Sequence, residues 1–288
     1  MKLKNKKQRL DSFLVSKNFF QTKNQAQAAV LAGLVKINDK TVSKAGMQIS
    51  QDVEIKITAE SLPYVSRGGL KLEKALKIFN INVNDKICLD IGASTGGFSD
   101  CLLQNQAKKI YAVDVGYGQL AWKLRNNEKI IVVERTNIRN ASFEQIYKDI
   151  KDIEIKNSSI FAEFATIDLS FISVTKVLQN IKFLMNQYNQ EIIILIKPQF
   201  EAGKTQVKKG GVVKDKEIHV NVIKQILEFA CTLGIYPVDL TYSPVKGPAG
   251  NIEYLVYIKN DQNYSENYLN QEKIKAVVDE SYEFFLQN

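Results

Sequence analysis

Short apolar runs alternate with amphipathic stretches through most of the chain. Seven runs have the length and composition of buried strands, and they cover Lys86–Ile91, Lys109–Val113, Ile130–Val133, Thr166–Leu169, Glu191–Ile196, Tyr236–Tyr242 and Glu253–Ile258. Stretches with helical character separate most of them, at Phe98–Gln104, Gln119–Arg125, Ser142–Ile150, Ser173–Asn186 and Glu217–Leu233. This alternation predicts an α/β fold with a sheet of about seven strands. Ser243–Asn251 joins the last two runs and is too short for a crossover helix, so the last strand is predicted to be antiparallel.

The first sixty residues contain shorter elements, which predict a separate small α+β module. Helices are expected at Arg9–Ser16 and Asn24–Ala32, and strands at Leu34–Ile37, Lys40–Val42 and Val53–Ile57. Pro63 blocks the continuation of a helix from the residues before it. We therefore expect a first domain over residues 1–60, a linker over 61–66, a larger domain over 67–260 and a helical tail over 261–288.

Much of the basic charge lies in this first module. The whole sequence has a net charge of +8, whereas residues 1–60 alone carry eleven Lys or Arg against five Asp or Glu. A basic end module favours an anionic partner, most simply nucleic acid, although a solvated lysine-rich surface would look the same. The candidate RNA contacts are Arg9, Lys17, Lys23, Lys36, Lys40, Lys44 and Arg67.

The cysteines and the apolar runs argue against several classes of protein. Cys88, Cys101 and Cys231 form no C-x-x-C pair, so neither a zinc site nor a disulfide framework is expected. The longest apolar runs are too short to span a bilayer, and the basic N-terminus is not followed by the apolar run of a signal peptide. These features predict a reduced, cytoplasmic protein without a metal centre.

One stretch, KICLDIGASTGGF over Lys86–Phe98, has the form of a nucleotide-type pocket. A buried strand runs into Gly92, Gly96 and Gly97 and then into a helix, and such turns bring the backbone close to a ligand. The glycine spacing departs from the dinucleotide fingerprint G-x-G-x-x-G. Asp90 would repel a pyrophosphate but suits the ammonium and sulfonium groups of S-adenosylmethionine. A tight turn that binds no ligand is the alternative.

A second acid supports this interpretation of the pocket. Asp114 ends the next strand about 22 residues after Gly92, where an acid can accept both ribose hydroxyls of a nucleoside. Asn137 follows the third strand and is placed to meet an adenine ring. The candidate cofactor residues are Asp90, Gly92, Ala93, Ser94, Thr95, Gly96, Gly97, Phe98, Asp114, Val115, Asn137 and Asp168.

Four charged residues fall where the strand ends of an α/β sheet meet. Asp168 and Lys197 close the fourth and fifth strands, and Glu253 begins the antiparallel last strand at the same edge. Lys71 lies in the helix before the first strand and could reach that edge. Lys197 follows five apolar residues and precedes Pro198, so it lies near a core edge, where burial disfavours the charged amine. Such an amine can activate a hydroxyl, although for each residue alone a surface salt bridge is the alternative.

Other residues carry weaker signals. His219 is the only histidine, and a structural hydrogen bond is favoured over a role at the cofactor. Tyr117, Trp122 and Phe200 could stack on a base, yet such aromatics are more often part of a core. The basic loop after Lys197 fits phosphate binding and a solvated loop equally well.

The chain resembles the TlyA-type RNA 2′-O-methyltransferases over about residues 8–259. Seven motifs carry the resemblance in order, and they are YVSRGGLKLEKAL, DIGASTGGFSDCLL, YAVDVGYGQLAWKLR, ERTNIR, DLSFIS, IKPQFEAG and SPVKGPAGNIEYL. The first sixty residues resemble the RNA-binding module of ribosomal protein S-four and of pseudouridine synthases.

The resemblance implies a Rossmann-like, S-adenosylmethionine-dependent methyltransferase sheet of the FtsJ type, with a small α+β N-terminal RNA-binding domain. It implies a Lys-Asp-Lys-Glu tetrad, which by motif is Lys71, Asp168, Lys197 and Glu253, and S-adenosylmethionine at Gly92–Gly97 and Asp114. The implied reaction is methylation of a cytidine ribose in ribosomal RNA, free or in ribosomal subunits. Two alternatives remain, an RNA-binding assembly protein with an inactive methyltransferase fold and a membrane-active hemolysin.

Overall fold

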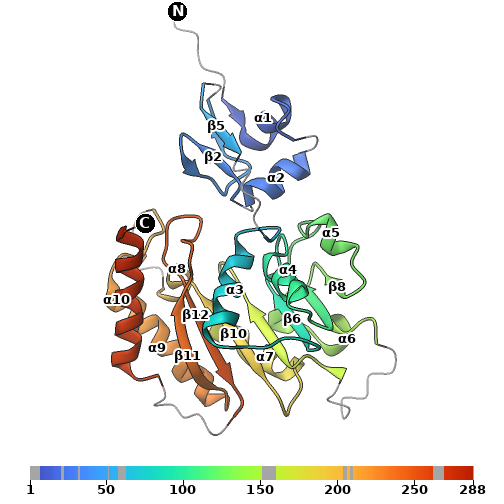
Figure 1. The fold of residues 1–288 in the computed structure, drawn as a ribbon, viewed down its shortest axis with the longest axis vertical. Helices are drawn as coiled ribbons and strands as arrows, with labels where there is room; N and C mark the ends of the chain where they lie inside the picture. Colours follow the sequence, from blue (N-terminus) through green and yellow to red (C-terminus); the bar gives the residue numbers. More distant parts are fainter. Residues whose placement is uncertain are drawn as a thin grey trace, which may run out of the picture.

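The computed structural model describes residues 7–20, 23–31, 33–50, 52–57, 63–150, 160–203, 206–207, 210–261 and 269–287. Figure 1 shows a small N-terminal part above a larger α/β part. The first residues of the predicted linker (61–62) and residues 262–268 of the predicted tail lie outside the described residues. So do Lys204, Lys208 and Lys209, which belong to the basic loop after Lys197.

The larger part is built on a seven-stranded sheet with the order β11-β12-β10-β9-β6-β7-β8. Its strands are β6 (Ile87–Ile91), β7 (Lys109–Val113), β8 (Ile130–Val133), β9 (Phe164–Ile167), β10 (Glu191–Ile196), β11 (Tyr236–Tyr242) and β12 (Tyr254–Lys259). The strands from β8 to β10 pair in parallel, whereas β12 is antiparallel to both β10 and β11. The predicted α/β class and the predicted antiparallel last strand are both confirmed.

The fourth predicted strand is wrong by two residues. It was expected at Thr166–Leu169, but β9 runs from Phe164 to Ile167. Phe164 and Ala165 are fully buried and pair with both neighbouring strands. Burial of these apolar side chains explains why the strand begins two residues before the predicted start. The shift leaves Asp168 as the first residue after the strand, at the carboxyl edge of the sheet.

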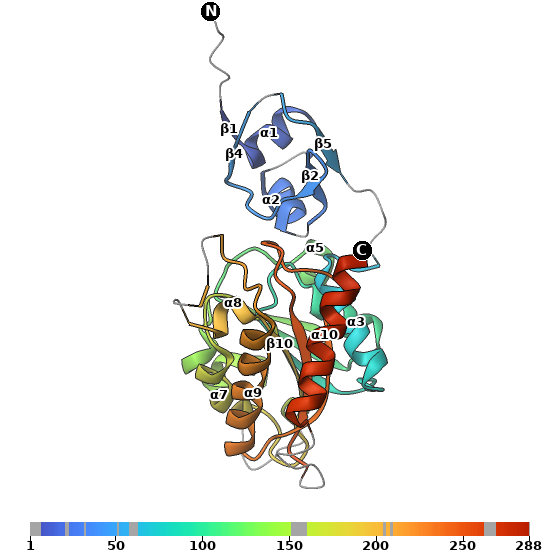
Figure 2. The ribbon, with the colours of Figure 1, turned by 90° about the vertical axis from the view of Figure 1, so that its left-hand side faces the viewer.

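Helices cover both faces of the sheet (Figures 1 and 2). One apolar cluster includes side chains of α3 (Gly68–Ile78), α4 (Gly97–Gln104) and α5 (Trp122–Arg125). The other includes side chains of α6 (Phe143–Ile146), α7 (Leu178–Leu184), α9 (Lys216–Thr232) and α10 (Gln271–Gln287). The helix α10 is therefore packed against the core, and Ser281 of α10 lies 3.2 Å from the Tyr254 hydroxyl of β12.

The N-terminal part has an apolar cluster of its own, centred on Leu10, Leu14 and Val30. It contains α1 (Leu10–Ser16), α2 (Lys23–Leu31) and a three-stranded sheet of β2 (Val35–Ile37), β3 (Lys40–Thr41) and β5 (Ile55–Ile57). A further pair, β1 (Gln8–Arg9) with β4 (Gln48–Ile49), was not predicted. Two-residue strands have too few positions to show a period in the sequence.

Neither a membrane-spanning helix nor a metal cluster is found among the described residues. None of their helices is both long enough and apolar enough to cross a bilayer. No three of their His, Cys, Asp or Glu side chains are grouped so that they could hold a metal ion.

Candidate active site

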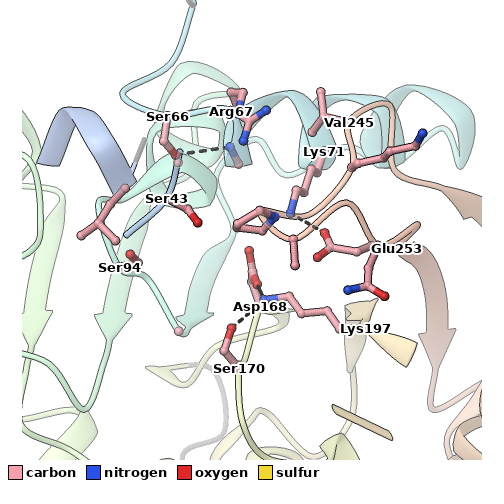
Figure 3. A pocket seen from close by; sticks show the side chains of 18 of the residues that line it. Ser43, Ser66, Arg67, Lys71, Ser94, Asp168, Ser170, Lys197, Val245 and Glu253 are labelled. Carbon is pink, nitrogen blue, oxygen red and sulfur yellow. Dashed lines mark hydrogen bonds and ion pairs between the residues drawn. The ribbon is translucent and has the colours of Figure 1, made fainter. Parts of the chain in front are cut away.

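A cavity of about 770 Å³ lies at the carboxyl edge of the sheet, below the N-terminal module (Figure 3). Its wall includes the glycine turn after β6 and the residues that follow β9 and β10. The N-terminal module contributes Leu31, Ser43 and Lys44 to the same wall. The cavity is thus shared by the two parts of the chain.

The glycine turn approaches the neighbouring strand end so closely that a side chain would not fit. Gly92 has a φ of +87°, and a Cβ there would lie 2.2 Å from the backbone oxygen of Asp168. Gly96 has a φ of +95°, and its Cβ would lie 2.3 Å from Leu124. Both positions need the conformational freedom of glycine. The turn lines the cavity with Gly92, Ala93, Ser94, Thr95 and Gly97, followed by Phe98.

Asp90 lies behind this turn and does not line the cavity, contrary to the expectation that it would face a cationic ligand. Its carboxylate is fully buried and accepts hydrogen bonds from Ser99 Oγ at 2.6 Å and Thr166 Oγ1 at 3.0 Å. Burial raises the pKa of Asp90 to about 6, despite these two hydrogen bonds. The side chain joins β6 to α4 and β9, so it supports the turn from inside the protein.

Four other predicted cofactor residues also lie outside the cavity wall. The Asp114 carboxylate accepts hydrogen bonds from Ser94 N at 2.8 Å and Gly116 N at 2.7 Å, and so holds the glycine turn against β7. Asn137 is exposed, and its side-chain oxygen accepts from Arg139 N. Val115 is 69% exposed. Gly96 contacts leucines of the α5 side instead of the cavity.

The four predicted tetrad residues line one wall of the cavity together. Lys71 Nζ lies 2.6 Å from Glu253 Oε2, and Lys197 Nζ forms an ion pair with Asp168 Oδ1 (Figure 3). Asp168 follows β9, Lys197 follows β10 and Glu253 precedes β12. These three strands are neighbours in the sheet, and β12 runs in the opposite direction. The sheet order therefore brings the three residues to one place.

Burial and opposite charges shape the electrostatics of this wall. Lys71 and Lys197 are each 8% exposed, and Glu253 is fully buried. Burial alone would lower the pKa of Lys71, but Glu253 and Asp168 outweigh it and raise that pKa. Burial would raise the pKa of Asp168, but Lys197 and Lys71 outweigh it and lower that pKa. Lys71 is therefore held as a cation and Asp168 as an anion.

The sequence analysis missed Ser170 and Phe171, which follow Asp168 in the same connection. Ser170 Oγ accepts a hydrogen bond from Lys197 Nζ at 3.0 Å and lines the cavity. Phe171 has a φ of +67° and is 90% exposed at the cavity, with its ring centroid 4.9 Å from that of Phe200. The motif DLSFIS offered a signal only through its position, two residues beyond a strand-end acid.

The predicted RNA contacts divide into two groups. Lys44 and Arg67 line the cavity, and the Arg67 guanidinium packs where a Cβ on Gly33 of the N-terminal module would lie. Burial lowers the pKa of Arg67 while Glu253 raises it, and the guanidinium stays charged. The others are Lys17, Lys23 and Lys40, which are exposed, Lys36, which is half-buried, and Arg9, which pairs with Asp11 at 2.6 Å.

Outside the cavity, His219 is buried, as expected for a structural residue. Its Nδ1 lies 2.7 Å from Tyr254 Oη and its Nε2 lies 3.0 Å from the Val213 oxygen. The expectation that Tyr117 and Trp122 belong to the core is wrong, because they are 68% and 77% exposed.

Comparison with known proteins gives two family matches. Residues 64–260 match the FtsJ-like methyltransferases, and residues 8–55 match the S4 domain. A Bacillus subtilis protein, YqxC, provisionally named an rRNA methyltransferase, is 44% identical over 96% of this chain and 95% of its own length. The 16S/23S rRNA (cytidine-2′-O)-methyltransferase TlyA of Mycobacterium tuberculosis is 37% identical over 87% of this chain and 89% of its own. A solved Streptococcus thermophilus structure, provisionally named a hemolysin, has a TM-score of 0.73 at 38% identity and covers 99% of this chain and 98% of that one.

Proposed function

The chain belongs to the FtsJ-like methyltransferase family, and we propose that it transfers a methyl group from S-adenosylmethionine to a cytidine ribose 2′-hydroxyl in ribosomal RNA. One observation carries this proposal. Two buried lysines, each paired with a carboxylate, line the same cavity as the glycine turn that follows β6. A hydroxyl brought into this cavity would meet both a proton acceptor and the cofactor's reactive methyl group.

The glycine turn fits the cofactor on its own geometry. S-adenosylmethionine supplies a methyl group on a positively charged sulfur. The turn at Gly92–Gly97 lines a cavity of about 770 Å³, which is of the size that holds such ligands. Asp168 is a member of the tetrad and also lies against the glycine turn, so we infer that it lies between S-adenosylmethionine and the RNA. Asp114 supports the turn through Ser94 and keeps further acceptor capacity for a ribose hydroxyl.

We assign the role of general base to Lys197. It follows β10 at the cavity wall and is 8% exposed, so its amine is shielded from bulk water. The 2′-hydroxyl proton would pass to Lys197 Nζ as the oxygen forms its bond to the methyl carbon, and the bond from that carbon to sulfur would break, so that sulfur leaves as a neutral thioether. Lys71 is a poorer candidate because Glu253 and Asp168 raise its pKa and hold it as a cation. Its positive charge instead stabilises the negative charge that develops on the 2′-oxygen as that atom loses its proton.

The RNA would reach the cavity from the side of the N-terminal module. Lys44 and Arg67 place positive charge at the cavity wall, where phosphates can be bound. Phe171 offers an exposed ring at the same wall, and exposed aromatics stack on unpaired bases. We propose that residues 1–60 dock on structured RNA, that 67–260 carry the reaction, and that the tail over 261–288 supports the sheet. Ribosomal subunits are the proposed form of the substrate.

The test is a methylation assay with tritiated S-adenosylmethionine and either isolated ribosomal subunits or naked ribosomal RNA. We expect wild type to label RNA at a nucleotide that resists alkaline cleavage, and Lys197→Ala to give no label. Lys129→Ala is the matched control, because Lys129 is an exposed lysine at the opposite edge of the sheet, before β8. A wild-type protein that binds S-adenosylmethionine but labels no RNA would favour the RNA-binding assembly protein instead.

A further inference from the structure

Lys197 meets two acceptors that come from a single turn of chain. Asp168 and Ser170 both follow β9, and each contacts the amine of Lys197 at the end of the adjacent parallel strand β10. The Ser170 hydroxyl lies 3.0 Å from Lys197 Nζ. In Figure 3, Asp168, Ser170 and Lys197 are grouped at the lower wall of the cavity, apart from the Lys71–Glu253 pair.

Two acceptors are the number that a neutral lysine amine needs if its direction is to be fixed. A charged ammonium has three N–H donors, whereas the neutral amine has two N–H donors and one lone pair in a tetrahedral arrangement. With Asp168 alone as acceptor, the neutral amine could turn about its last bond and point its lone pair in several directions. With a second acceptor at Ser170, both hydrogens are engaged and the lone pair takes the remaining position.

We propose that Ser170 is a positioning residue that directs the lone pair of Lys197 toward the substrate hydroxyl in the cavity. This inference rests on the proposed function of Lys197 as general base. Lys197, Asp168 and Ser170 all line the cavity, so an amine held by these two acceptors lies where a ligand can reach it. After proton transfer, Ser170 also accepts a hydrogen bond from the charged amine. Its hydroxyl is therefore paired with Lys197 whether the amine is neutral or charged.

The side chain of Ser170 has little role in stability. Ser170 is exposed to the cavity, and within the described part of the chain its hydroxyl is bonded to Lys197. Surface substitutions of this kind usually leave the free energy of unfolding almost unchanged. A loss of rate in Ser170→Ala would therefore report on the amine and not on the fold.

The experiment measures single-turnover methylation of ribosomal RNA against RNA concentration for wild type, Ser170→Ala and Ser170→Thr. We expect Ser170→Ala to lower the rate at saturating substrates about 10- to 100-fold, the size expected for a misdirected reacting group. Its apparent affinity for RNA should equal that of wild type, because the loss concerns the direction of the amine and not the binding of RNA. Ser170→Thr retains the hydroxyl and should recover most of the rate.

Ser173→Ala is the matched control. Ser173 lies in the same connection, but its hydroxyl pairs with Thr175 and not with Lys197. Its rate and apparent affinity for RNA should equal those of wild type. A Ser170→Ala protein with wild-type rate, or with only a weaker apparent affinity for RNA, would overturn the inference. An inactive wild-type protein would instead overturn the proposed function, so the two failures are distinguishable.

Discussion

Lys71 Nζ lies 2.6 Å from Glu253 Oε2, and this contact joins α3 to the start of β12 across 182 residues of sequence. Both side chains are at least nine-tenths buried. A buried charge that loses its partner is costly, while removal of both charges is often tolerated. The pair therefore contributes both to the stability of the fold and to catalysis, and single and double substitutions can separate these two contributions.

We expect Lys71→Met to lower the free energy of unfolding by about 3–5 kcal/mol, because it leaves the Glu253 carboxylate buried and unpaired. The double variant Lys71→Met/Glu253→Gln should regain most of that stability and yet remain inactive in methylation. Urea unfolding followed by circular dichroism measures the first effect, and the tritium assay the second. Lys224→Met is the control, since its partner Glu228 is 3.7 Å away and both are exposed, so the change should be below about 1 kcal/mol.

The buried carboxyl of Asp90 should make stability depend on pH. Its pKa is raised to about 6 by burial. Between the unfolded pKa and this value, the folded state therefore holds a proton that the unfolded state has released. The stabilising contribution of the protonated form is complete below the unfolded pKa, about 3.9, and is lost as pH rises through about 6. The loss amounts to about 3 kcal/mol at neutral pH.

Asp90→Asn removes this titration and provides the test. The free energy of unfolding of the variant minus that of wild type should rise by about 3 kcal/mol between pH 4 and pH 7. Urea unfolding at intervals of pH, with both proteins in the same buffers, gives this difference directly. A difference that stays flat over the range would show that the Asp90 carboxyl is ionised in the fold throughout.

The close approach at Gly92 predicts a specific loss of cofactor binding. In Gly92→Ala the new Cβ would lie 2.2 Å from the Asp168 oxygen, so the turn and the strand end must move apart. We expect calorimetric titration to show no binding of S-adenosylmethionine to this variant. Gly118→Ala is the matched control, because Gly118 also has a positive φ, +71°, but no described atom lies within 4 Å of its Cβ position. Equal binding by the two variants would contradict the assigned cofactor site.

The strands of the sheet and the two tetrad residues that end them could be predicted from the sequence for the same reason, whereas the order of the strands was not predicted. Buried parallel strands are continuous apolar runs, so Asp168 and Lys197 were visible as charges that end such runs. Asp90 was misjudged because it lies within a strand with both neighbours buried, and the sequence does not say on which side of the sheet its carboxylate finds partners. The two hydroxyls that bind it, Ser99 and Thr166, come from other elements.

The shared cavity could not be predicted, because it depends on where the N-terminal module rests. Leu31, Ser43 and Lys44 of the module line the cavity, and Gly33 of the module lies against Arg67. The net charge favoured an anionic partner for the module, but it did not show which of the basic residues would contact that partner. The structure distinguishes Lys44 at the cavity from Arg9, whose guanidinium is already paired with Asp11.

This distinction leads to a prediction for Lys44. Lys44 is exposed at the cavity wall, so Lys44→Ala should weaken RNA binding without changing the affinity for S-adenosylmethionine. If Lys44 contacts a phosphate, the slope of log K against log salt should become shallower by about 0.7–1, because one fewer counterion is released. Binding of an rRNA fragment at several salt concentrations measures the slope, and Lys129→Ala should leave it unchanged. Weaker binding with an unaltered slope would instead mean that Lys44 acts by holding the module in place, since a lost phosphate contact must change the salt dependence.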